Sequence, residues 1–209
     1  MKHALSALVV SFGLSLPALA SAQELGRKGD AVFSVDRLMG ITATHIAGER
    51  GAMQYHDDYT SLSFGWRASP DLSPFDVPRF AFDYLVIDHL SIGGALGYAS
   101  VDADQANDYS TFIISPRVGY AYAFGKVVGI WPRGGFTYHS TSVDNSFDEK
   151  GFALSLECPF TFSPAQHFAF HVGPSFDIDM FGSRDPSPIN KGDRSYRAFG
   201  LNGGLLAWF

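Results

Sequence analysis

Seven segments between residues 77 and 209 alternate between two kinds of side chain, and this alternation most constrains the fold. Turn residues or polar runs bound each segment. Alternation with a period of two places successive side chains on opposite faces of a β-strand. The sequence therefore predicts strands at 77–88, 90–101, 109–124, 127–140, 151–163, 167–181 and 195–209. An eighth is expected at 31–46, with a bulge where Asp36 and Arg37 interrupt the pattern.

One of the two faces carries no charge. In the seven regular segments it comprises 41 positions such as Phe80, Phe112 and Phe176, and none is charged, although charged residues make up 17% of the chain. The opposite face carries small and ionisable residues. An eight-stranded barrel can enclose side chains or one small ligand, but not some forty mostly bulky groups. The small and charged face must therefore point inward, and the aromatic face outward into lipid.

The predicted fold class is thus all-β, an eight-stranded antiparallel up-and-down transmembrane β-barrel. Short turns are expected at 88–89, 125–126 and 163–166, and longer polar loops at 47–76, 102–108, 142–150 and 182–193. In outer-membrane barrels the short turns are periplasmic, and aromatic residues form a girdle at each interface. Those girdles are predicted at Tyr84, Tyr120, Tyr122, Phe124 and Phe209 on the turn side, and at Tyr98 and Tyr138 on the loop side.

The segment TSLSFGW, residues 60–66, resembles a ninth strand. An odd number of strands would put the two chain ends on opposite sides of the membrane. We therefore place this segment in the first outer loop, 47–76, as one arm of a hairpin above the membrane.

Residues 1–22 have the layout of a secretory signal peptide, with Lys2 and His3 before an apolar stretch and small residues at the end. The predicted organisation is a signal peptide at 1–22 and a barrel domain at 23–209. Removing Lys2 from the 15 basic residues leaves 14 against 21 acidic ones, a net charge of −7 that argues against nucleic acid as a partner. The single cysteine, Cys158, lies in a strand and is interpreted as a small apolar residue.

The inward face is predicted to carry a lumen charge cluster. Three of its arginines follow a proline, in the repeated pairs at 78–79, 116–117 and 132–133, and here we expect the arginine to point inward and the proline outward. The cluster is expected to form ion pairs that plug the lumen, and it comprises Arg79, Asp83, Arg117, Arg133, Glu157, His171 and Asp177.

The last residues, LNGGLLAWF, resemble the C-terminal signal that bacterial outer-membrane β-barrels present to their assembly machinery, with Phe209 as the terminal aromatic residue. The hairpin FAFDYLVIDHLSIGGALGYAS is similar to the strand, turn and strand unit of small OmpA-like and OmpX-like barrels. The resemblance implies the cell outer membrane as the location. It also implies outer-membrane lipids, lipopolysaccharide and the barrel assembly machinery as partners.

Three functions remain open from the sequence. The favoured one is a structural or surface-interaction barrel with acidic outer loops, and it requires no catalytic residue, metal or cofactor. The second is a narrow, porin-like channel, although eight strands leave little aqueous space. The third is an enzyme that modifies lipid A, for which His139, the polar run at 140–142 and Glu149 come nearest to a catalytic set. Alternation directs His139 inward and Ser140 outward, which argues against such a unit.

Overall fold

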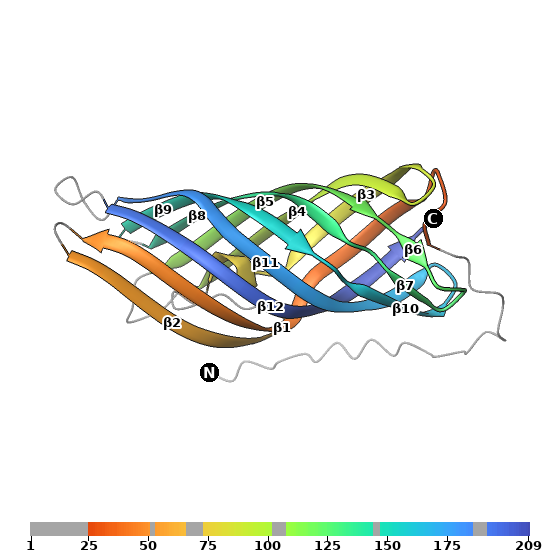
Figure 1. Ribbon diagram of the computed structural model, residues 1–209, viewed down its shortest axis with the longest axis horizontal. Helices are drawn as coiled ribbons and strands as arrows, with labels where there is room; N and C mark the ends of the chain where they lie inside the picture. The colour runs from red at the N-terminus through yellow and green to blue at the C-terminus, as the bar shows by residue number, and fades with distance from the viewer. Residues whose placement is uncertain (1–24, 51–52, 66–72, 102–107, 144–146, 186–191) are drawn as a thin grey trace, which may run out of the picture.

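The chain forms a closed antiparallel β-barrel (Figure 1). The computed structural model describes residues 25–50, 53–65, 73–101, 108–143, 147–185 and 192–209. Within these residues eight chain segments build the barrel wall: β1 (Ala31–Arg50), β3 (Arg79–Ile87), β4 (Leu90–Val101), β5 (Tyr109–Tyr120) with β6 (Tyr122–Ala123), β7 (Val128–Ile130) with β8 (Arg133–Val143), β9 (Phe147–Glu157) with β10 (Phe160–Ala165), β11 (Phe168–Asp185) and β12 (Gly192–Trp208). Pairing of β1 with β12 closes the barrel and confirms the predicted fold class.

Short turns join β3 to β4, β6 to β7 and β10 to β11 at the end of the barrel that also holds the C-terminus (Figure 1). We call this the turn end and the opposite one the loop end. His89 and Gly125 adopt positive φ in two of these turns. The third turn was expected at 163–166, which is wrong, because β10 continues to Ala165 and the chain reverses at Gln166 and His167. Several strands also extend further into the loops than the alternation indicated.

The two faces of the wall differ as the alternation predicted. The uncharged register is turned outward, with aromatic rings such as Phe80, Phe170 and Phe199 exposed, while small and charged residues are buried inside. An exposed apolar band of this extent is stable in lipid and not in water. Among the described residues, no helix is long and apolar enough to cross a membrane.

Proline interrupts the ladders in one region of the wall. The prolines at 132 and 159 separate β7 from β8 and β9 from β10, because a proline has no N–H to donate. Backbone hydrogen bonds continue across the interruption, from the Trp131 N–H to the Pro159 carbonyl and from the Cys158 N–H to the Pro174 carbonyl. The wall therefore stays continuous although its strands are broken.

The prediction for the proline-arginine pairs is correct for two of the three. Pro116 and Pro132 are exposed on the outer face, and the arginine that follows each is buried inside. Pro78 is buried instead. It precedes β3 at the end of a segment that folds into the barrel, so it does not lie in the wall.

The predicted bulge in β1 is present. The pairing of β1 with β12 shifts between Val35 and Met39, and Arg37 has a φ of 55°. The extra residue lets two consecutive side chains, Asp36 and Arg37, point into the lumen, where both are buried.

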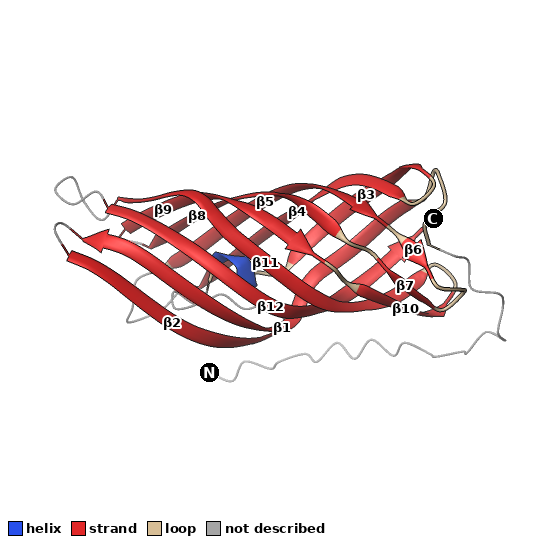
Figure 2. Ribbon diagram, viewed as in Figure 1, coloured by secondary structure: helices blue, strands red, loops and turns tan. Residues whose placement is uncertain are grey.

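The expected hairpin arm is β2 (Met53–Phe64), which pairs with residues 39–50 of β1. Nearer the turn end, β3 takes the corresponding place beside residues 31–36 of β1. After β2 the chain folds into the barrel, where the short 3-10 helix η1 (Pro74–Asp76) lies enclosed by strands (Figure 2). This inward-folded segment, Ser73–Pro78, was not predicted. The signal peptide at 1–22 lies outside the described residues.

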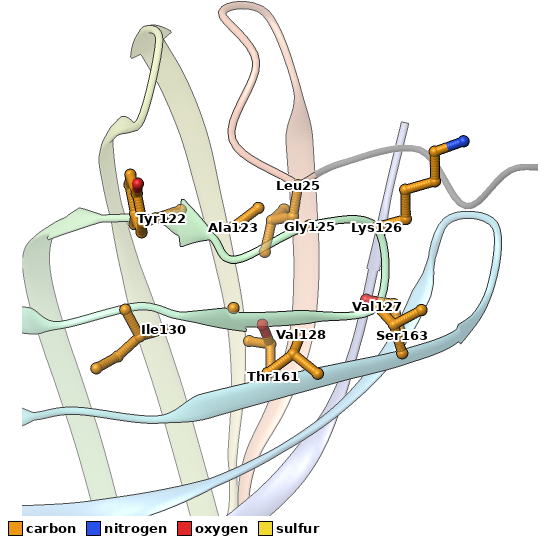
Figure 3. Close-up of a pocket in the computed structure, with 12 residues that line it drawn as sticks. Leu25, Tyr122, Ala123, Gly125, Lys126, Val127, Val128, Ile130, Thr161 and Ser163 are labelled. Carbon is orange, nitrogen blue, oxygen red and sulfur yellow. The ribbon is translucent and has the colours of Figure 1, made fainter.

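Apolar side chains fill the turn end of the barrel. Leu25 reaches from the N-terminal segment toward the β6–β7 hairpin, while Lys126 projects away from the wall (Figure 3). The segment is fastened to the β3–β4 hairpin by hydrogen bonds from the Gly29 N–H to the Leu85 carbonyl and from the His89 N–H to the Gly26 carbonyl. Its leucine belongs to a buried cluster of Leu25, Val32, Leu85, Ala121, Trp131, Ala169, Leu206 and Trp208. Beside it remains a cavity of about 10 Å³, the size of one water molecule.

Candidate functional site: the charged lumen

Charged side chains from six strands meet in the middle of the lumen. Arg117 on β5 lies at the centre of one group: its Nε donates to Asp83 Oδ1 at 3.1 Å, and its two terminal nitrogens donate to Asp83 and Asp36. Paired donors that match a carboxylate in this way make the strongest charge-assisted hydrogen bonds. Arg117 thus ties β1, β3 and β5 together through the interior.

Arg37 forms the second group. One terminal nitrogen donates to Asp177 at 2.8 Å, and the other donates to Glu157 at 2.8 Å. The first of these nitrogens also donates to the Phe75 carbonyl at 2.8 Å. This arginine therefore connects β1, β9, β11 and η1, and it can do so because the bulge turns it inward.

Arg133 joins the two groups. It donates to Glu157 at 2.8 Å and lies 3.4 Å from Asp36. The Nε2 atom of His171 lies 3.1 Å from the other oxygen of Asp36. The ion pairs consequently form one connected network across the lumen.

Arg79 differs from the other arginines. It is buried, and its Nε and one terminal nitrogen have no hydrogen-bond partner. Among the described residues, the ion-paired groups of the network are three arginines (37, 117 and 133) and four carboxylates (36, 83, 157 and 177). Counting the buried Arg79 with them brings the formal sum to zero when His171 is neutral. A neutral sum reduces the cost of removing these charges from water.

A second polar layer lies toward the loop end. His139 Nε2 is 3.1 Å from Asp179 Oδ1, and the other oxygen of Asp179 accepts the Tyr196 N–H at 3.0 Å. Arg194 donates to Glu149 at 2.9 Å and lies over the ring of Tyr196. This layer lies in the lumen between the ion network and the loop end.

The inward-folded segment lies between the two layers. The ring of Phe75 is fully buried and meets the edges of His139 and Tyr196, at centroid distances of 5.4 and 6.2 Å. Asp76 accepts a hydrogen bond from Ser61 on β2 at 2.7 Å, and Val77 packs against Ala99 and Ile113. The segment is therefore held by β1, β2, β4, β5, β8 and β12 together.

The structure places all seven residues of the predicted lumen charge cluster on the inner face of the wall. Six of them take part in ion pairs or close charge contacts, and Arg79 is the exception. The sequence reasoning missed Asp36 and Arg37, because a bulge breaks the alternation on which it relied. The sequence does contain a sign of their position, because two adjacent charged residues within an apolar strand indicate a bulge that turns both side chains inward. It also assigned no role to Asp179, whose partner His139 lies 40 residues away.

The residues nearest to a catalytic set are not brought together. His139 contacts Asp179, whereas Glu149 pairs with Arg194, and Ser140 lies on the opposite face of β8 from His139. Cys158 is a partly buried free thiol. In the described part of the chain, no group of three or more His, Cys, Asp or Glu residues is placed to hold a metal ion.

Little space remains within the network. A cavity of about 10 Å³ lies between Asp36, Arg133, His171 and Asn202, enough for about one water molecule. Chemically, the arrangement can hold strands together through charge-assisted hydrogen bonds.

No protein-family model matches this sequence. No curated protein sequence matches it either. Among solved structures, the outer membrane protein OprG from Pseudomonas aeruginosa aligns with a TM-score of 0.56 and 11% identity, over 90% of this chain and 99% of OprG. Neisserial surface protein A aligns with a TM-score of 0.48 and 13% identity, over 85% and 97% of the two chains. Ail of Yersinia pestis aligns with a TM-score of 0.43 and 10% identity, over 86% and 99%. The alignment with OprG, together with the closed eight-segment wall, shows that the chain has the fold of a small outer-membrane β-barrel.

Proposed function

We propose that this protein is an integral outer-membrane barrel of structural or surface-interaction type, without enzymatic activity, whose lumen is plugged by its own side chains. The observation that carries the proposal is the connected network of Arg37, Arg117 and Arg133 with four carboxylates across the lumen. An eight-stranded barrel has an interior that side chains can fill. In this proposal they do so in three layers, with buried apolar residues at the turn end, ion pairs in the middle and a mixed layer toward the loop end.

In this proposal the chain is exported by the signal peptide at 1–22 and inserted by the barrel assembly machinery through its C-terminal strand. The turn end faces the periplasm, as short turns do in such barrels. The acidic segments at 102–108 and 142–150 then face the cell exterior, where they meet partners or the divalent ions among lipopolysaccharide molecules.

Conductance in planar lipid bilayers tests the plug against the alternative of a narrow channel. We expect the purified, folded protein to give no steady openings, because the ion network and the Ser73–Pro78 segment occupy the path. A double variant, Arg37→Ser with Phe75→Gly, removes the bond to the Phe75 carbonyl and the ring above it, and we expect brief openings to appear. Steady openings of porin size in the unchanged protein would instead establish the channel.

The absence of enzymatic activity is tested separately, by incubating the folded protein with lipopolysaccharide and analysing its lipid A by mass spectrometry. We expect the acyl chains to remain intact. Deacylation by the unchanged protein that is lost in the His139→Ala variant would replace this proposal with that of an enzyme.

A further inference from the structure

A groove near the loop end lies mostly on the outside of the barrel, and among its lining residues Arg194 also belongs to the second polar layer of the lumen. The groove has a volume of about 460 Å³, within the range of small-ligand sites. Its floor is made by small residues, Ala47 and Gly48 on β1 and Ser195 on β12. Gln54 and His56 line one side, and Met180 and Phe181 line the other. We call this the outer groove.

The outer groove results from an irregularity in β11. The pairing of β11 with β12 shifts between Ile178 and Ser183, and its pairing with β9 shifts between Asp179 and Phe181. The bulge leaves both Met180 and Phe181 exposed on the outside of the wall. On the other side, β2 adds a polar strand next to β1. The floor between these two walls is low because its side chains are small.

The position of the outer groove matches the boundary between lipid tails and headgroups. Toward the turn end from Ser195, the next outward residues of β12 are Arg197, Phe199 and Leu201. Phe199 and Leu201 belong to the exposed apolar band, and Arg197 is exposed directly between this band and the groove. A cationic side chain at this height is suited to the phosphate of a lipid headgroup.

Further polar groups line up beside Arg197. His45 on β1 is its partner in the strand register, and the rings of His45 and His56 stack at a centroid distance of 5.8 Å. A carboxylate is also present, because Asp58 on β2 lies 2.6 Å from the Nδ1 atom of His45. That contact occupies Asp58 with His45, whereas His56 lines the groove and Arg197 is exposed next to its turn-end border.

We propose that the outer groove binds the headgroup of a phosphorylated glycolipid of the outer leaflet, namely lipid A. In this arrangement Arg197 and His56 hold a phosphate, and the sugar rests on the small-residue floor. The acyl chains run along Phe199 and Leu201, beside Met180 and Phe181. The assignment rests on the outer-membrane location proposed above, and it is independent of whether the lumen conducts.

Methyl NMR of the full mature chain, folded in detergent micelles, can measure this binding. Residues 23–209 hold three methionines, of which Met180 lines the outer groove and Met39 lies on the lipid-facing wall away from it. We expect rough-type lipopolysaccharide to shift the Met180 methyl signal in a saturable manner and to leave Met39 largely unchanged. Phosphatidylglycerol and inorganic phosphate, added separately, should give at least tenfold weaker effects.

Variants make the test specific. Arg197→Ala combined with His56→Ala should weaken binding at least tenfold, whereas Lys150→Ala, which removes an outward cation near the loop end of β9, should not change it. If the double variant does not fold, Ala47→Trp provides a second test, since the added ring fills the floor while all charges remain.

The proposal is overturned if Met39 and Met180 respond equally, if phosphatidylglycerol or phosphate alone binds as tightly, or if Ala47→Trp binds unchanged. Folding is checked in each sample by the difference in gel migration before and after boiling. A folded barrel that does not bind lipopolysaccharide contradicts the outer groove, whereas a chain that never folds as a barrel contradicts the proposed function.

Discussion

Two arginines that follow a proline in the same way have different surroundings. Arg117 donates three hydrogen bonds to Asp36 and Asp83, whereas Arg79 leaves its Nε and one terminal nitrogen without a partner. Burying a guanidinium is costly unless its donors are satisfied. The two residues therefore differ in what they contribute to stability, although the local sequence around them is alike.

Replacing each arginine by methionine measures this difference. Arg117→Met leaves two carboxylates without their main partner, and we expect it to lower the free energy of unfolding by about 3–5 kcal/mol. Arg79→Met removes a guanidinium whose Nε and one terminal nitrogen make no hydrogen bond. The loss of unfolding free energy should therefore be less than half of that for Arg117→Met. Urea titration of the folded barrels measures both values. A loss below about 0.5 kcal/mol for Arg117→Met, or equal losses for the two variants, would contradict the ion-pair network.

At the scale of elements, the seam between β1 and β12 depends on glycine. The adjacent residues Gly203 and Gly204 both lie in the last strand, but a Cβ on Gly204 would overlap the carbonyl oxygen of Val35 and lie 2.6 Å from His171 Nε2. A Cβ on Gly203 would meet its nearest atoms, the His171 oxygen and Met39 Cγ, at 3.3 Å. The strands can thus approach closely only where the inward position lacks a side chain.

We expect Gly204→Ala to disturb barrel closure and to reduce the folded fraction severely, since backbone at the seam would have to move. Gly203→Ala is the matched control, and it should fold with yields close to those of the unchanged protein. The measurement is the fraction of the folded band on an unboiled gel after refolding. Equal yields for the two variants would show that the seam has more freedom than the contacts indicate.

The inward-folded segment is an element whose stability depends on one ring. Phe75 is fully buried, and Phe75→Ala should lower the free energy of unfolding by about 3–5 kcal/mol because the neighbouring strands cannot collapse into the space. Phe64 on β2 is 74% exposed, and Phe64→Ala should cost less than half as much. Urea titration compares the two. Similar costs would indicate that the segment is held by its backbone contacts alone.

At the scale of the whole molecule, the outward aromatic band and the closed ladder predict the behaviour of a membrane barrel. We expect the protein to fractionate with the outer membrane and to migrate differently on a gel before and after boiling. The reason is that the eight wall segments close on themselves through β1 and β12, so detergent at room temperature finds a free edge among the described strands only at β2, which pairs with β1 alone. A protein found in the soluble fraction, with a single migration position, would contradict the assignment of the apolar band to lipid.

The alternation by itself determined the number of strands in the wall, the face that each side chain occupies and the residues available to the lumen. It could do so because the side-chain period of a strand is two, so every residue of a regular strand is assigned to a face by its position alone. Arg79, Arg117 and His171 were placed inside on this basis, and Phe209 at the end of the last strand.

Only the tertiary structure decided which of these residues meet. The bulge turns Arg37 inward, where it meets Phe75 and Asp177, 38 and 140 positions away in the chain. His139 likewise meets Asp179, 40 positions away. Such contacts depend on the stagger between strands and on the closure of the barrel, and neither leaves a periodic trace in the chain. Local geometry therefore determined the two faces of the wall, while the closure of the barrel determined the network inside it.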